Sequence, residues 1–257
     1  MLKAQKFSLA FAVALLLSTA ALAQPLPRVT RPEDLGISSE RLDRLRAQKK
    51  TDVETRRIPG AVLLIARHAK LAVLDTFGFQ DRAAQTPMKA DSIFRIASMS
   101  KPITSVAIMI LAEQGKLDIG APVAQYLPEF KDVKVGVEKA ASKRPITVQD
   151  LLRHTSGLTY GIFGTSPVDE LYKKSNMFAA KSLADMVKQI ASLPLLHQPG
   201  EVWEYSVSTD VLGRIVEVAS GLDLDRFVAE RITGPLARGP LDNECKHFGF
   251  PPGQSIV

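Results

Sequence analysis

Two short apolar runs near the start of the chain have the pattern of a β-hairpin. Residues 61–66 and 71–77 are rich in β-forming residues, and the polar segment 68–70 separates them. Ahead of them, Ser38 or Ser39 is placed to cap a helix. The beginning of the chain is therefore expected to contribute one helix and two paired strands.

The rest of the chain has apolar residues mainly at helical spacing. The expected helices cover residues 103–111, 147–152, 183–193 and 210–219. Pro102 suits the first turn of the first of these helices, and Gly115 ends it. No internal repeat or low-complexity tract is present, so the pattern predicts one α+β domain.

The first residues have the pattern of an export signal. Lysines precede the apolar run 9–17, and the small-residue pattern A-x-A ends at Ala23. The run is shorter than the ~20 residues that span a bilayer, so no stable membrane anchor is expected. We predict a signal peptide over residues 1–23, cleavage after Ala23 and a periplasmic or secreted protein.

Composition and charge narrow the function classes. With 257 residues, 46% of them hydrophobic and 23% charged, the chain can bury one sizeable core. The net charge of +6 is scattered and lacks a dense basic run, which argues against nucleic-acid binding. The single cysteine, Cys245, excludes an internal disulfide.

Ser98 and Lys101 form an S-x-x-K element at the start of the helix that follows Pro102. Residues three apart on a helix share a face, so the lysine can reach the serine hydroxyl. A serine becomes a strong nucleophile when a neighbouring base takes its proton, and helix-start N–H groups can stabilise an oxyanion. The element alone is weak, because a chain of this length contains about one by chance.

Three segments in order make the pattern specific, namely residues 94–104, 151–158 and 199–206. Together they resemble class C serine β-lactamases, penicillin-binding D-alanyl-D-alanine carboxypeptidases and family VIII carboxylesterases. The resemblance runs from about Leu35 to Leu236. It implies a β-lactamase/transpeptidase-like α+β fold, with an antiparallel sheet flanked by helices plus a mostly helical region.

The resemblance also implies the catalytic residues. Ser98 would be the nucleophile, and Lys101 and Tyr205 would move protons, without any cofactor. Relatives often have Tyr-x-Asn where this chain has Tyr205-Ser206-Val207. Loss of the amide favours a family VIII-type carboxylesterase that acts on short-chain esters over a β-lactamase. A β-lactamase, a D-alanyl-D-alanine carboxypeptidase or an inactive truncated homologue remains the alternative.

The histidines are given no catalytic or metal-binding role. His154 lies in a segment that the resemblance assigns to a turn, where it would hold the loop, and Lys101 already supplies a base. His68, His197 and His247 lack the close spacing of metal ligands, so no metal is implied.

The end of the chain departs from the family. The family's third element, on a strand near the C-terminus, has no counterpart here, and residues 237–257 lack periodicity. We expect residues 24–236 to be a partial hydrolase domain without its C-terminal strands, followed by an atypical tail from a frameshift or premature end. Such a chain would be unstable or nearly inactive, unless it completes its sheet by pairing with another chain.

Overall fold

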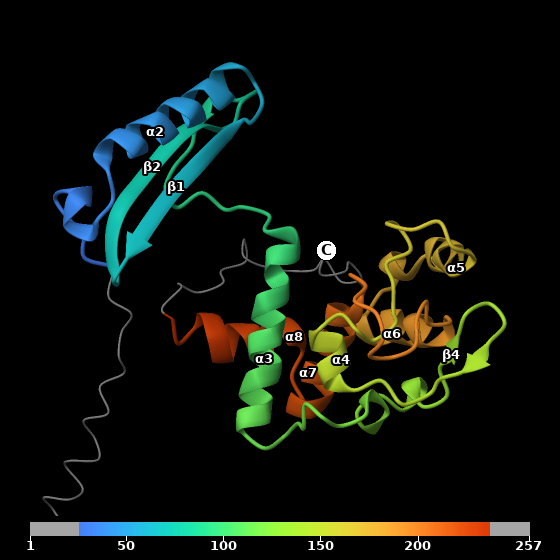
Figure 1. The fold of residues 1–257 in the computed structure, drawn as a ribbon. Coiled ribbons are helices and arrows are strands. Elements are labelled where there is room, and N and C mark those ends of the chain that lie inside the picture. Colours follow the sequence, from blue (N-terminus) through green and yellow to red (C-terminus); the bar gives the residue numbers. More distant parts are fainter. Residues whose placement is uncertain (1–25, 237–257) are drawn as a thin grey trace, which may run out of the picture. The chain divides into compact units, whose positions relative to one another are not determined.

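The computed structural model describes residues 26–236, which form two compact units, residues 26–95 and residues 96–236 (Figure 1). The predicted signal peptide and the predicted tail, residues 237–257, lie outside the described residues. None of the helices in the described part is long and apolar enough to cross a membrane.

The first unit is a helix on a small antiparallel sheet. After the 3₁₀ turn η1 (Pro32–Leu35), the elements are α2 (Ser39–Glu54), β1 (Gly60–Arg67), β2 (Lys70–Asp81) and β3 (Thr86–Pro87), in the sheet order β1-β2-β3. The Ser38 hydroxyl accepts the N–H of Arg41 and caps α2, which lies along the sheet in Figure 1. The predicted helix and hairpin are confirmed, and the short strand β3 was not predicted.

Helices make up nearly all of the regular secondary structure in the second unit. Its α-helices are α3 (Lys101–Glu113), α4 (Val148–Leu152), α5 (Pro167–Lys174), α6 (Leu183–Ser192), α7 (Ser208–Ser220) and α8 (Leu224–Val228). Its shorter elements are η2 (Ala97–Ser100), η3 (Val123–Gln125), η4 (Pro128–Phe130), β4 (Lys134–Val135), β5 (Ala140–Ala141), η5 (Met177–Ala179) and the π-helical turn η6 (Ala229–Thr233). The four helices predicted in this region are confirmed within two residues at each end, and α5 and α8 were not predicted.

Helix α7 lies at the centre of this unit and packs against α3, α4, α6 and α8. Its core face carries Val211, Leu212, Ile215 and Val216, all buried. The facing side of α3 is also apolar and buried, through Ala107, Ile108 and Leu111. Removing such side chains from water is the main force that holds helices together. The packing of α3 on α7 fixes the segments that lead into these two helices.

Candidate active site

Ser98 lies in the 3₁₀ turn η2, immediately before α3. The S-x-x-K element was expected to lie on one helix. The structure divides it instead, with Ser98 in a 3₁₀ turn and Lys101 as the first residue of α3. Ala97 has a φ of 44°, a left-handed conformation that residues with a Cβ seldom adopt. The turn places the Ser98 hydroxyl, which is half-buried, beside the first residue of α3.

Lys101 is buried, with only 8% of its surface exposed. Its Nζ donates a hydrogen bond to Ser98 Oγ over 3.2 Å. The same ammonium group lies 4.8 Å from the centre of the Tyr205 ring and 5.4 Å from that of Tyr160, within the range of cation–π attraction. The buried cation is thus held between the serine and two aromatic rings.

Tyr205 reaches the same serine from a segment 107 residues further along the chain. Its hydroxyl donates to Ser98 Oγ over 2.7 Å. Desolvation raises the pKa of the Tyr205 phenol, but the interactions with Lys101 and Ser98 together outweigh it and leave the pKa below the ordinary value of 10. The structure therefore brings together Ser98, Lys101 and Tyr205, the three residues singled out from the sequence.

His154 holds the segment that carries Tyr205. Its carbonyl accepts the Glu204 N–H over 2.8 Å, and its Nδ1 accepts the Ser206 N–H over 3.3 Å. The ring centres of His154 and Tyr205 are 4.9 Å apart. Burial, and then the positive charge of Lys101, lower the pKa of His154 to about 4. Near neutral pH the ring is uncharged, with its proton on Nε2 because Nδ1 is an acceptor.

Three fully buried hydroxyls continue this anchor into the protein. Ser206 Oγ lies 2.8 Å from Ser208 Oγ, which lies 2.8 Å from Ser156 Oγ. Ser156 Oγ also accepts the Leu158 N–H. Buried polar groups are costly unless they are paired, so this chain of hydroxyls ties the His154 loop to the start of α7.

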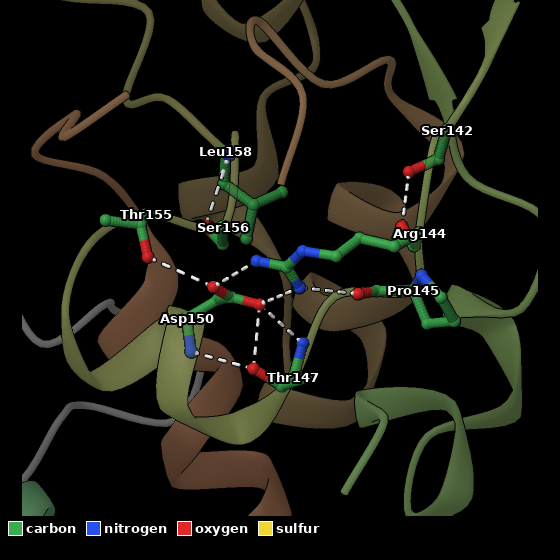
Figure 2. Close-up of polar contacts among 8 residues, drawn as sticks. All are labelled: Ser142, Arg144, Pro145, Thr147, Asp150, Thr155, Ser156 and Leu158. Carbon is green, nitrogen blue, oxygen red and sulfur yellow. Dashed lines mark hydrogen bonds and ion pairs between the residues drawn. The ribbon is translucent and has the colours of Figure 1, made fainter. Parts of the chain in front are cut away.

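Asp150 fixes the other side of the same loop (Figure 2). Arg144 binds both of its carboxylate oxygens, at 2.7 and 2.8 Å, and the hydroxyls of Thr147 and Thr155 donate to it. Burial alone would raise the pKa of Asp150, but these donors and the Arg144 charge lower it to about 2. Gly200, with a φ of 86°, lies so close to the Arg144 guanidinium that a Cβ would collide with it.

Two further polar residues next to the site were missed from the sequence. Tyr160 is buried, and its hydroxyl has no hydrogen-bond partner among the residues that the structure describes. Burial, followed by the charge of Asp210, raises the pKa of Tyr160. Asp210 is fully buried in the first turn of α7 and opposes the pKa lowering at Tyr205. An acidic residue in a first helical turn is common, so it carried no distinguishing signal.

Two of the other three histidines lie in the described part of the chain. His68 is in the exposed turn between β1 and β2, and His197 Nε2 is 3.9 Å from the Glu204 carboxylate. His247 lies outside the described residues. Within residues 26–236, no group of three potential His, Cys, Asp or Glu ligands is arranged to hold a metal ion.

Comparison with known proteins identifies similar sequences over most of the chain. The family model described as "Beta-lactamase" matches residues 43–249. Esterase EstB of Burkholderia gladioli is 35% identical over 205 residues, which cover 76% of this chain and 50% of EstB. The chain spans about half the length of the curated relatives it matches.

Solved structures give the same result for the fold. The hydrolase EstCE1, described as having promiscuous acyltransferase activity, is 30% identical, with a TM-score of 0.68 over 76% of this chain and 51% of its own. Unliganded simvastatin synthase (LovD) of Aspergillus terreus is 27% identical, with a TM-score of 0.63 over 77% of this chain and 53% of its own. These similarities confirm the expected α+β architecture.

The contacts of His154 generate a prediction about stability and pH. In the unfolded chain the histidine pKa is close to 6.5, and in the folded chain it is about 4. The neutral His154 side chain therefore contributes its full stabilisation of the folded chain above pH 6.5, and this contribution is lost as pH falls toward 4. We expect urea unfolding to show a lower midpoint at pH 5 than at pH 7.5. His154→Asn, which keeps a hydrogen-bond acceptor and tolerates the left-handed φ of 56°, should lose much of this difference.

Two further variants serve as comparisons in the unfolding measurement. His68→Asn is the matched control, because His68 also has a left-handed φ, of 52°, but is exposed, and it should keep the wild-type pH dependence. His154→Ala should be less stable at both pH values by about 1–3 kcal/mol, since the Ser206 N–H loses its acceptor. Equal pH dependence in wild type and His154→Asn would contradict the assignment.

Proposed function

The chain belongs to the β-lactamase family, and we propose that it is a serine hydrolase that acts on small carboxylic esters through an acyl-enzyme on Ser98. One observation carries the proposal, namely that Lys101 Nζ and the Tyr205 hydroxyl both contact Ser98 Oγ, at 3.2 and 2.7 Å. Two proton-exchanging groups on one serine oxygen form the arrangement that an activated nucleophile requires.

The chemistry follows from these contacts. Tyr205, as a phenolate stabilised by the Lys101 charge, takes the Ser98 proton while Oγ bonds to the ester carbonyl carbon. The tetrahedral intermediate collapses when the bond to the alcohol oxygen breaks and Tyr205 returns the proton to that oxygen. Water, deprotonated by the same pair, then attacks the acyl-enzyme, and the carboxylic acid leaves with Ser98 restored.

Esters are favoured over β-lactams by the residue two positions after Tyr205. Val207 is fully buried in the core of the helical unit, so this position offers no polar group to a substrate. Similarity to a protein named as an esterase supports the same choice. Hydrolysis of a β-lactam or of a D-alanyl-D-alanine peptide is the alternative, since both use the same serine and lysine chemistry.

We predict that Ser98→Ala abolishes labelling in any preparation of the chain that a fluorophosphonate probe labels, because the probe bonds to the activated serine oxygen. Ser192→Ala is the matched control, since Ser192 is an exposed serine at the end of α6. Tyr205→Phe should slow labelling by about 100-fold or more. Tyr126→Phe is the control for this variant, because the Tyr126 hydroxyl accepts the Asp118 N–H and does not contact Ser98. It should label at the wild-type rate.

Undiminished labelling of Ser98→Ala would exclude Ser98 as the nucleophile. Turnover by the same preparations separates the two substrate classes. In preparations that label, we expect hydrolysis of 4-nitrophenyl acetate and little hydrolysis of a chromogenic cephalosporin, and we expect Ser98→Ala to lose both activities. Faster turnover of the cephalosporin would favour the β-lactamase alternative.

We also propose that the protein is exported, on the basis of the apolar run 9–17 and the small residues before Gln24. Exported protein should begin at Gln24, because signal peptidase cleaves after the A-x-A pattern. N-terminal sequencing of material from the periplasm or medium tests this directly. Material from that fraction with Met1 still in place would contradict the proposal.

A further inference from the structure

Two loops of the helical unit expose aromatic side chains next to Tyr205. Phe163 lies between α4 and α5, and Trp203 lies in the segment before α7. Phe163 is 66% exposed and Trp203 is 65% exposed, although large aromatic side chains are usually well buried. Their neighbours Ile162 and Val202 are exposed as well, so each loop presents a pair of apolar residues.

Both exposed rings contact the ring that touches the nucleophile. The Phe163 ring centre is 6.0 Å from that of Tyr205, and the Trp203 ring stacks on Tyr205 at 6.4 Å with an angle of 28° between the planes. Both distances are within the range of favourable aromatic pairs. Because the Tyr205 hydroxyl lies 2.7 Å from Ser98 Oγ, the apolar surface begins beside the reacting atom.

We propose that Phe163 and Trp203 form an aromatic platform that binds the apolar part of the ester, so that the preferred substrates carry a medium-length alkyl or aryl group. This inference rests on the proposed function, since it assumes that the ester carbonyl is placed at Ser98. An apolar group attached to that carbonyl can lie on rings that would otherwise be exposed to water.

The surroundings favour an apolar group over a charged one. The two charges that act on Tyr205, those of Lys101 and Asp210, are buried, so they are not presented to a substrate on the surface. The two rings keep flat, exposed faces, and such faces recognise apolar and aromatic groups. The platform therefore distinguishes esters by the size of their apolar part.

The fluorescence of Trp203 can report ester binding to the platform, because Trp203 is the only tryptophan in the 257 residues. The full chain carrying Ser98→Ala, which cannot turn the ester over, is titrated with ethyl hexanoate while tryptophan emission is recorded. We expect a saturable shift in emission with ethyl hexanoate and none with ethyl acetate at the same concentrations. Phe163→Ala in the same background should weaken the apparent affinity for ethyl hexanoate about tenfold.

Kinetics test the same platform in protein with Ser98 intact. Phe163→Ala and Trp203→Ala should each lower kcat/KM for 4-nitrophenyl hexanoate about tenfold, mainly through KM, and change that for 4-nitrophenyl acetate less than about threefold. Val218→Ala is the control, because Val218 is 43% exposed but lies about 15 Å further along α7 than its first residue. It should leave both values unchanged.

The outcomes separate this inference from the proposed function. Fluorophosphonate labelling at Ser98 with equal use of both esters and an unresponsive Trp203 would overturn the platform and leave the hydrolase standing. A saturable Trp203 response without labelling would overturn the hydrolase and support the platform as a binding surface. A concentration-dependent dimer whose dissociation exposes Trp203 would show that a second copy covers the platform, and would overturn the inference.

Discussion

The packing of α7 against α3 is the constraint on which the site depends. Ser98 and Tyr205 each lie a few residues before one of these helices, so the apolar contact between the helices determines whether the two hydroxyls meet. The apolar part of this contact is made by aliphatic side chains, whose removal from water contributes about 25 cal/mol per Å². A cavity along this contact would destabilise the packing that holds Tyr205 beside Ser98, without removing either residue.

Polar contacts hold the segment before α7, which carries Tyr205 and lies outside the helices of the apolar core. The segment before α7 has no regular structure, and it is held on one side by His154 and the buried serine hydroxyls and on the other by the Asp150 and Arg144 pair. These anchors work only while His154 is neutral and Asp150 is ionised, which the lowered pKa values of both side chains ensure near neutral pH. A short loop is thereby made rigid enough to place a phenol beside a nucleophile.

The elements that depend on local sequence patterns could be predicted from the sequence. The hairpin, the Ser38 cap and helices α3, α4, α6 and α7 follow from periodicity and capping, and the expected family is confirmed by the match over residues 43–249. Helix α5 was missed even though Ser166 and Asp169 form a capping box, because its apolar pattern is only two turns long. The proximity of Tyr205 to Ser98 came from family resemblance, since no local rule relates residues so far apart. The buried Tyr160 and Asp210 could not be found, because burial is a property of the folded chain.

We infer that a tyrosine with a lowered pKa, beside a buried lysine, activates Ser98. The pH dependence of the rate of fluorophosphonate labelling measures this activation. We expect the rate to rise with pH to a plateau with a midpoint below 10, and Tyr205→Phe to remove this rise. The same pH profile in wild type and Tyr205→Phe would show instead that another group activates the serine.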